Sequence, residues 1–146
     1  MYLDQFTGKG IRIAVIDSGV HATHPHVGGV SGGLAIREDG SVADDYVDRI
    51  GHGTAVTAAI KEKAPDADFI AIKVFDRTLA TGVAMIVRAI DEAARHGAHV
   101  INLSLGTAEI QHRDDLAAAV ARANDRGALI VSALEDEGVQ WLPGSH

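Results

Sequence analysis

The sequence has 146 residues, with 47% hydrophobic but only 4% aromatic side chains and a formal net charge of −7 at pH 7. This length supports one domain whose core is built mainly from Ala, Val, Ile and Leu. The negative charge argues against a nucleic-acid partner, since phosphate backbones bind to basic surfaces. Cysteine is absent, which excludes disulfides and thiolate metal sites.

The start of the chain carries no recognisable targeting signal. Residues 1–6 lack a basic segment followed by an apolar stretch, so they do not match a signal peptide. No apolar run is long enough to span a bilayer, and we expect no membrane partner. We therefore expect a cytoplasmic protein.

The first predicted element is a short, mostly β-branched run at residues 11–16 that ends at Asp17. Its near-continuous apolar character is typical of a parallel strand buried on both faces. Functional groups collect at the carboxyl ends of strands in open α/β sheets. Asp17 is therefore a candidate functional carboxylate, and a capping or turn aspartate is the alternative.

Residues 21–50 are rich in His, Gly and Asp and predict turns and loops, with a short strand at 33–36. Three histidines in this segment raise the question of a metal site (His21, His24 and His26). Histidines in a loop are more often solvated than bound to a metal, so we predict no metal site.

A histidine between two glycines follows, in Gly51-His52-Gly53-Thr54. Glycines allow a close approach of backbone, and the apolar residues after Thr54 predict a helix that stops before Pro65. Three acidic residues precede this motif (Asp44, Asp45 and Asp48). They could stabilise a charged histidine nearby, but a solvated acidic loop is the simpler interpretation.

The rest of the chain alternates between strands and helices. Five elements are predicted, namely strand 69–74, helix 83–94, strand 100–105, helix 116–123 and strand 128–133. Gly97 and Gly127 are expected to end the two helices in the left-handed conformation. This alternation predicts an α/β fold with a parallel sheet, right-handed crossovers and helices on both faces.

Four motifs occur in a characteristic order: Asp-Ser-Gly-Val from Asp17, His24-Pro25, Gly-His-Gly-Thr around His52, and Asn-Leu-Ser-Leu-Gly from Asn102. Together they resemble the first half of a subtilisin-like serine peptidase of the subtilase family, from about Gly10 to Gly138. The resemblance implies that residues 1–146 form a single, partial subtilisin-like domain, a truncated three-layer sandwich. An unrelated flavodoxin-like domain fits the layout but does not explain the motifs.

The resemblance also implies roles for particular residues. Asp17 would orient the imidazole and His52 would be the general base of a Ser-His-Asp triad. Ser104, Leu105 and Gly106 would bind an extended peptide or protein substrate as an added strand, with an ordinary strand end as the alternative. No cofactor is implied.

Two parts of the family's machinery are not found. The family places its nucleophile in Gly-Thr-Ser-x-Ala-x-Pro, and none of the six serines has that context (Ser18, Ser31, Ser41, Ser104, Ser132 and Ser145). Asp136 stands where the family has the oxyanion asparagine, and a carboxylate repels the charge that this position should stabilise. Ala55 also replaces a second histidine of the family.

Two functional interpretations remain open. The chain is either a component of peptide processing that needs a partner for hydrolysis, or a catalytically dead pseudopeptidase that binds peptides or proteins. In both cases we expect the isolated chain to be inactive. An uncovered strand and apolar face are also expected, which predicts a homodimer or a hetero-partner covering the sheet.

Overall fold

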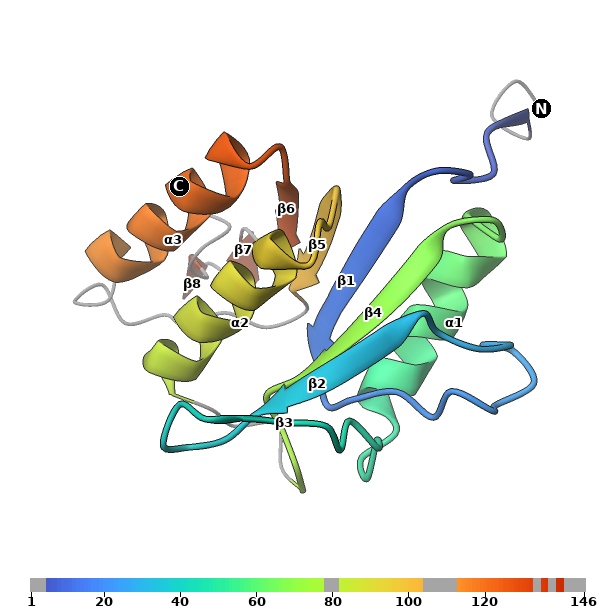
Figure 1. The fold of residues 1–146 in the computed structure, drawn as a ribbon, viewed down its shortest axis with the longest axis horizontal. Coiled ribbons are helices and arrows are strands. Elements are labelled where there is room, and N and C mark those ends of the chain that lie inside the picture. Colours follow the sequence, from blue (N-terminus) through green and yellow to red (C-terminus); the bar gives the residue numbers. More distant parts are fainter. Residues whose placement is uncertain (1–4, 78–81, 104–112, 133–134, 137–138, 141–146) are drawn as a thin grey trace.

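The computed structural model describes residues 5–77, 82–103, 113–132, 135–136 and 139–140. These residues form a six-stranded sheet in the order β3-β2-β4-β1-β5-β6 (Figure 1). The strands are β1 Arg12–Asp17, β2 Gly32–Ile36, β3 Val42–Ala43, β4 Asp68–Lys73, β5 Val100–Leu103 and β6 Leu129–Ser132. All neighbours in this sheet are parallel except β2 and β3.

Three helices connect the strands, α1 His52–Lys63, α2 Val83–Arg95 and α3 Arg113–Asp125. Apolar residues of α2 and α3 pack with one face of the sheet in a single large cluster. The opposite face, including Ile13 and Phe69, packs against Val56 and Ile60 of α1. The fold is therefore the predicted α/β sandwich, with a mostly parallel sheet between two helical layers (Figure 1).

The central strand β1 carries the first candidate residue. It pairs with β4 on one side and with β5 on the other, and residues 13–17 are all buried. In register, Asp17 lies opposite Lys73 at the carboxyl end of β4. Strand pairing on both sides up to Ile16, and with β4 at Asp17 itself, gives Asp17 a fixed backbone position at the edge where functional groups collect.

The predicted helix ends agree with the structure. Gly97 and Gly127 follow α2 and α3 with φ of 78° and 88°, the left-handed conformation that glycine adopts without strain. Among the described residues, none of the helices is both long and apolar enough to cross a membrane.

Some bounds differ from the prediction. Helix α1 begins at His52 rather than near Thr54, because side chains from elsewhere in the chain bind its first free N–H groups. The two-residue strand β3 was not predicted; it forms where a tight turn at Gly40 folds the chain back onto β2. A short antiparallel pair, β7 Glu135–Asp136 and β8 Val139–Gln140, was not predicted either.

Candidate active site

Asp17 and His52 lie in direct contact. The Nδ1 atom of His52 is 2.8 Å from Oδ1 and 2.9 Å from Oδ2 of Asp17. Asp17 is completely buried, whereas the side chain of His52 is 38% exposed. The structure thus brings together a buried carboxylate and a solvent-accessible imidazole that are 35 residues apart in the sequence.

The backbone around Asp17 fixes its carboxylate. The carbonyl oxygen of Asp17 accepts a 2.8 Å hydrogen bond from the N–H of Val74, the residue that follows β4. Its Oδ1 atom accepts a 2.7 Å bond from the N–H of Ser18. The carboxylate therefore has a backbone donor on one side and the imidazole of His52 on the other.

Two glycines let the histidine approach. A Cβ added to Gly53 would collide with the carbonyl oxygen of Gly19 and would lie 3.2 Å from Cβ of Asp17. Gly19 has φ of +102°, and a Cβ there would collide with the carbonyl oxygen of Tyr46. The first turn of α1 therefore lies against the turn that follows β1, which places His52 within reach of Asp17.

This contact determines which ring nitrogen is available for chemistry. A carboxylate is only an acceptor, so Nδ1–H of His52 donates to Asp17 and the lone pair of the neutral ring lies on Nε2. The described residues give Nε2 no hydrogen-bond partner. The nearby hydroxyl of Ser18 is bound elsewhere, since it donates to Asp48 and accepts from the N–H of Gly53. The pair can hold and release a proton at Nε2.

Asp48 is the residue of this site that sequence reasoning missed. Its carboxylate accepts five hydrogen bonds from described residues, where a solvated acidic loop was expected. Burial raises the pKa of Asp48, but hydrogen bonds from Thr54, Gly51 and Ser18 outweigh this effect and hold the pKa below its ordinary value. The available signal was its place just before a helix start, where N–H groups need acceptors.

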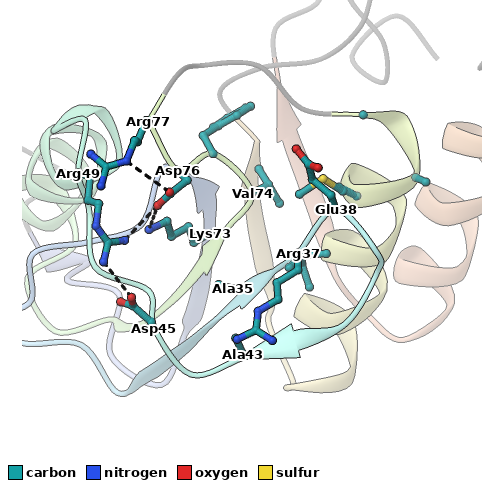
Figure 2. A pocket seen from close by; sticks show the side chains of 15 residues that line it. Ala35, Arg37, Glu38, Ala43, Asp45, Arg49, Lys73, Val74, Asp76 and Arg77 are labelled. Carbon is teal, nitrogen blue, oxygen red and sulfur yellow. Dashed lines mark hydrogen bonds and ion pairs between the residues drawn. The ribbon is translucent and has the colours of Figure 1, made fainter.

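A pocket of about 820 Å³ lies next to the loop that contains Asp45 and Arg49, at the carboxyl ends of β2 and β4 and the start of α2. Figure 2 shows Arg49, Lys73 and Arg77 around Asp76 on one wall. Lys73 is 5% exposed and also donates a 2.7 Å bond to the carbonyl oxygen of Val47. These charges bind one another, and Asp17 and His52 do not line the pocket.

The remaining predicted site residues are not all described. Ser104, Leu105 and Gly106 lie outside the described residues. Asp136 is in β7, which pairs with β8, and only its backbone is described.

The loop histidines make local contacts. The Nδ1 atom of His24 accepts from the N–H of His26, and Nε2 of His21 bonds to the hydroxyl of Thr23. Among the described residues, no group of His, Asp and Glu side chains is arranged to hold a metal ion.

The Asp17–His52 pair has the arrangement of the carboxylate and the imidazole in a Ser-His-Asp triad, and it lies at the carboxyl edge of a parallel sheet in an α/β fold. The sequence matches the subtilase family, peptidase S8, over residues 8–140. The chain belongs to this family.

Individual relatives agree with this assignment. The chain is 36% identical to the thermostable alkaline protease of Halalkalibacterium halodurans, over 92% of this chain and 38% of that protein. It is 33% identical to subtilisin Savinase of Lederbergia lenta, over 90% of this chain and 50% of that protein. The chain thus spans half or less of the length of these two curated relatives.

Solved structures show the same fold. The nisin leader peptidase NisP from Lactococcus lactis superposes with a TM-score of 0.76 at 25% identity, covering 91% of this chain and 46% of that one. A lanthipeptide protease superposes with a TM-score of 0.77 at 26% identity, covering 94% and 43%. The structural likeness therefore extends over nearly all of this chain and less than half of either neighbour.

Proposed function

We propose that this chain supplies the carboxylate and the histidine of a serine-peptidase site, with Asp17 orienting His52 and His52 acting as the general base. The observation that carries this proposal is the two-oxygen contact of Asp17 with Nδ1 of His52. A purely peptide-binding domain has no need of a buried carboxylate directed at an imidazole. The contact leaves Nε2 in the role of proton acceptor from a nucleophile.

The nucleophilic serine, in this proposal, lies outside residues 1–146, on a segment of the same or another polypeptide that carries Gly-Thr-Ser-x-Ala. Two facts support it: the chain spans half or less of the relatives described above, and Ser18 is bound to Asp48 and Gly53. The role would be the processing of precursor peptides. That substrate class is supported by the two structural neighbours, which are a leader peptidase and a lanthipeptide protease.

A fluorophosphonate probe tests the proposal, because it labels only an activated serine. The protein of residues 1–146 alone should remain unlabelled. Labelling should appear on the serine-bearing segment once that segment is joined to, or mixed with, this chain. It should fall by orders of magnitude with His52→Ala, since the members of a triad act as a unit. Stoichiometric labelling of the protein of residues 1–146 alone would contradict the need for an outside serine.

The alternative is a pseudopeptidase that binds peptides or proteins without cleaving them. The resemblance to the family favours it: in that alignment Asp136 stands where the family has the oxyanion asparagine, and a donor lost from that position costs roughly 10²–10³ in turnover. Under this alternative, the joined protein stays unlabelled while fluorescence anisotropy detects peptide binding that His52→Ala does not change. Asp136→Asn separates the two cases, because it should raise labelling only if the site is hydrolytic.

A further inference from the structure

One carboxylate connects the two segments that carry the Asp–His pair. Oδ1 of Asp48 accepts a 2.8 Å bond from the hydroxyl of Ser18, the residue after Asp17, and a 2.7 Å bond from the N–H of Gly51, the residue before His52. Asp48 is therefore bound on both sides of the site, to the end of β1 and to the start of α1.

The second oxygen of Asp48 binds the first turn of α1. Oδ2 accepts from the N–H of Thr54 at 2.9 Å and from its hydroxyl at 2.6 Å. Helix α1 has no capping side chain at Gly51, so Asp48 and Ser18 bind the N–H groups that the helix start leaves free. A negative charge is also favoured at this end of a helix.

The loop that carries Asp48 is itself anchored. The carbonyl oxygen of Tyr46 accepts a 3.0 Å bond from the N–H of Val20, and that of Val47 accepts a 2.7 Å bond from Nζ of Lys73. Lys73 is in turn paired with Asp76 at 2.8 Å. Asp48 is thus held to the sheet by contacts other than its own.

We propose that Asp48 is a positioning residue for the Asp17–His52 pair, fixing the start of α1 against the end of β1 so that Nδ1 of His52 faces the carboxylate of Asp17. The proposal deepens the proposed function, since it concerns the same pair, but the geometry can be measured without hydrolysis. Its lowered pKa is consistent with an ionised carboxylate that accepts from Ser18, Ile50, Gly51 and Thr54 at neutral pH.

The substitution Asp48→Asn removes the negative charge and one hydrogen-bond acceptor of the side chain but keeps its shape. An amide has one oxygen and one NH₂ group, so either the Ser18 and Gly51 donors or the Thr54 donors would face another donor. The side chain would keep nearly the same volume. Asp48→Asn should therefore release one of the two segments without leaving a cavity.

The test uses residues 1–146 labelled with ¹⁵N and observes the imidazole ring of His52 by NMR. The variant His52→Gln identifies the ring signals. The unmodified chain should show the Nδ1–H tautomer and a low-field Nδ1–H proton. In Asp48→Asn this proton should be lost to exchange and the Nε2–H tautomer should appear. Asp45→Asn is the matched control, because Asp45 lies in the same loop but bonds to Val47 and Arg49.

Thr54 gives a second pair of variants for the case in which Asp48→Asn does not fold. Thr54→Ser keeps the hydroxyl that reaches Asp48 and should leave the His52 signals unchanged, whereas Thr54→Val should shift them toward the Nε2–H tautomer. A folded Asp48→Asn chain, or a folded Thr54→Val chain, with an unaltered Nδ1–H proton would overturn the proposal. So would an equal loss in Asp45→Asn. Failure of fluorophosphonate labelling would contradict the proposed function alone, since the NMR readout involves no serine.

Discussion

At the scale of single residues, the site depends on a carboxylate that water cannot reach. Asp17 is fully buried, and the described partners of its carboxylate are the imidazole of His52 and the N–H of Ser18. A buried charge is tolerated when it is paired and hydrogen-bonded. The stability of the fold and the geometry of the pair are therefore linked through this one side chain.

A double-mutant cycle measures that link. His52→Ala removes a partner of a buried acceptor and should lower the free energy of unfolding by about 1–3 kcal/mol. In the Asp17→Asn background the same change should cost less, giving a coupling energy of at least about 0.5 kcal/mol. Urea unfolding followed by circular dichroism provides the four values. Strictly additive effects would contradict an interaction between the two side chains.

Asp48 also predicts a pH dependence of stability. Its pKa in the folded protein is lower than the ordinary value of 3.8, so its stabilising effect is fully present above that value and is lost as the pH falls through the folded pKa. Between pH 6 and pH 3 the free energy of unfolding should fall less steeply in Asp48→Asn than in the unmodified chain. Urea unfolding at each pH tests this, and parallel profiles for the two proteins would contradict it.

At the scale of elements, the start of α1 is fitted to the turn after β1. The first turn of the helix contacts Gly19 and Asp17 through Gly53, with no room for a side chain. By contrast, Gly82 precedes α2 with φ of −83°, and among the described residues no atom beyond Gly82 and its chain neighbours lies within 4 Å of a Cβ built there. Gly53 lies inside the first turn of α1 and Gly82 just before α2, and their surroundings are very different.

This difference in crowding gives two contrasting substitutions. Gly53→Ala should move α1 away from β1 and destabilise the fold by about 1–3 kcal/mol, the usual cost of overpacking. Gly82→Ala should change the free energy of unfolding by no more than about 0.5 kcal/mol. Thermal and urea unfolding of both variants measure the contrast. Equal effects of the two substitutions on the free energy of unfolding would contradict the view that Gly53 leaves no room for a side chain.

Some of these elements can be predicted from the sequence and others cannot. Strands β1, β4 and β5 and helix α2 are predictable because each has an apolar pattern of its own and a glycine or proline boundary. Asp17 and His52 are predictable as candidates from the motifs around them. The beginning of α1 and the role of Asp48 are not, because bonds from residues distant in sequence determine both. Strand β3 is too short to give a periodic signal.

At the scale of the whole molecule, the two edges of the sheet differ. Strand β6 pairs with β5 at one edge, and its Leu129 and Val131 are 62% and 49% exposed. They lie on the same face of the sheet as Val100, which packs in the apolar cluster between the sheet and α1. Helix α1 lies over β1 and β4 and leaves β6 uncovered (Figure 1). Exposed apolar side chains on an edge strand favour association.

We therefore predict that a second copy or a partner protein covers the β6 edge. In sedimentation velocity at micromolar concentration, the unmodified chain should show concentration-dependent association. Leu129→Lys combined with Val131→Lys should yield the monomer, since burying two charges opposes the contact. Val42→Lys is the control, because Val42 is 41% exposed on β3 at the opposite edge. A compact, well-folded monomer of the unmodified chain would rule out a homodimer. In that case the prediction would be that a different protein segment covers the β6 edge. It would fail if fluorophosphonate labelled the double-lysine chain, joined to the serine-bearing segment, as efficiently as it labels the unmodified chain joined to the same segment.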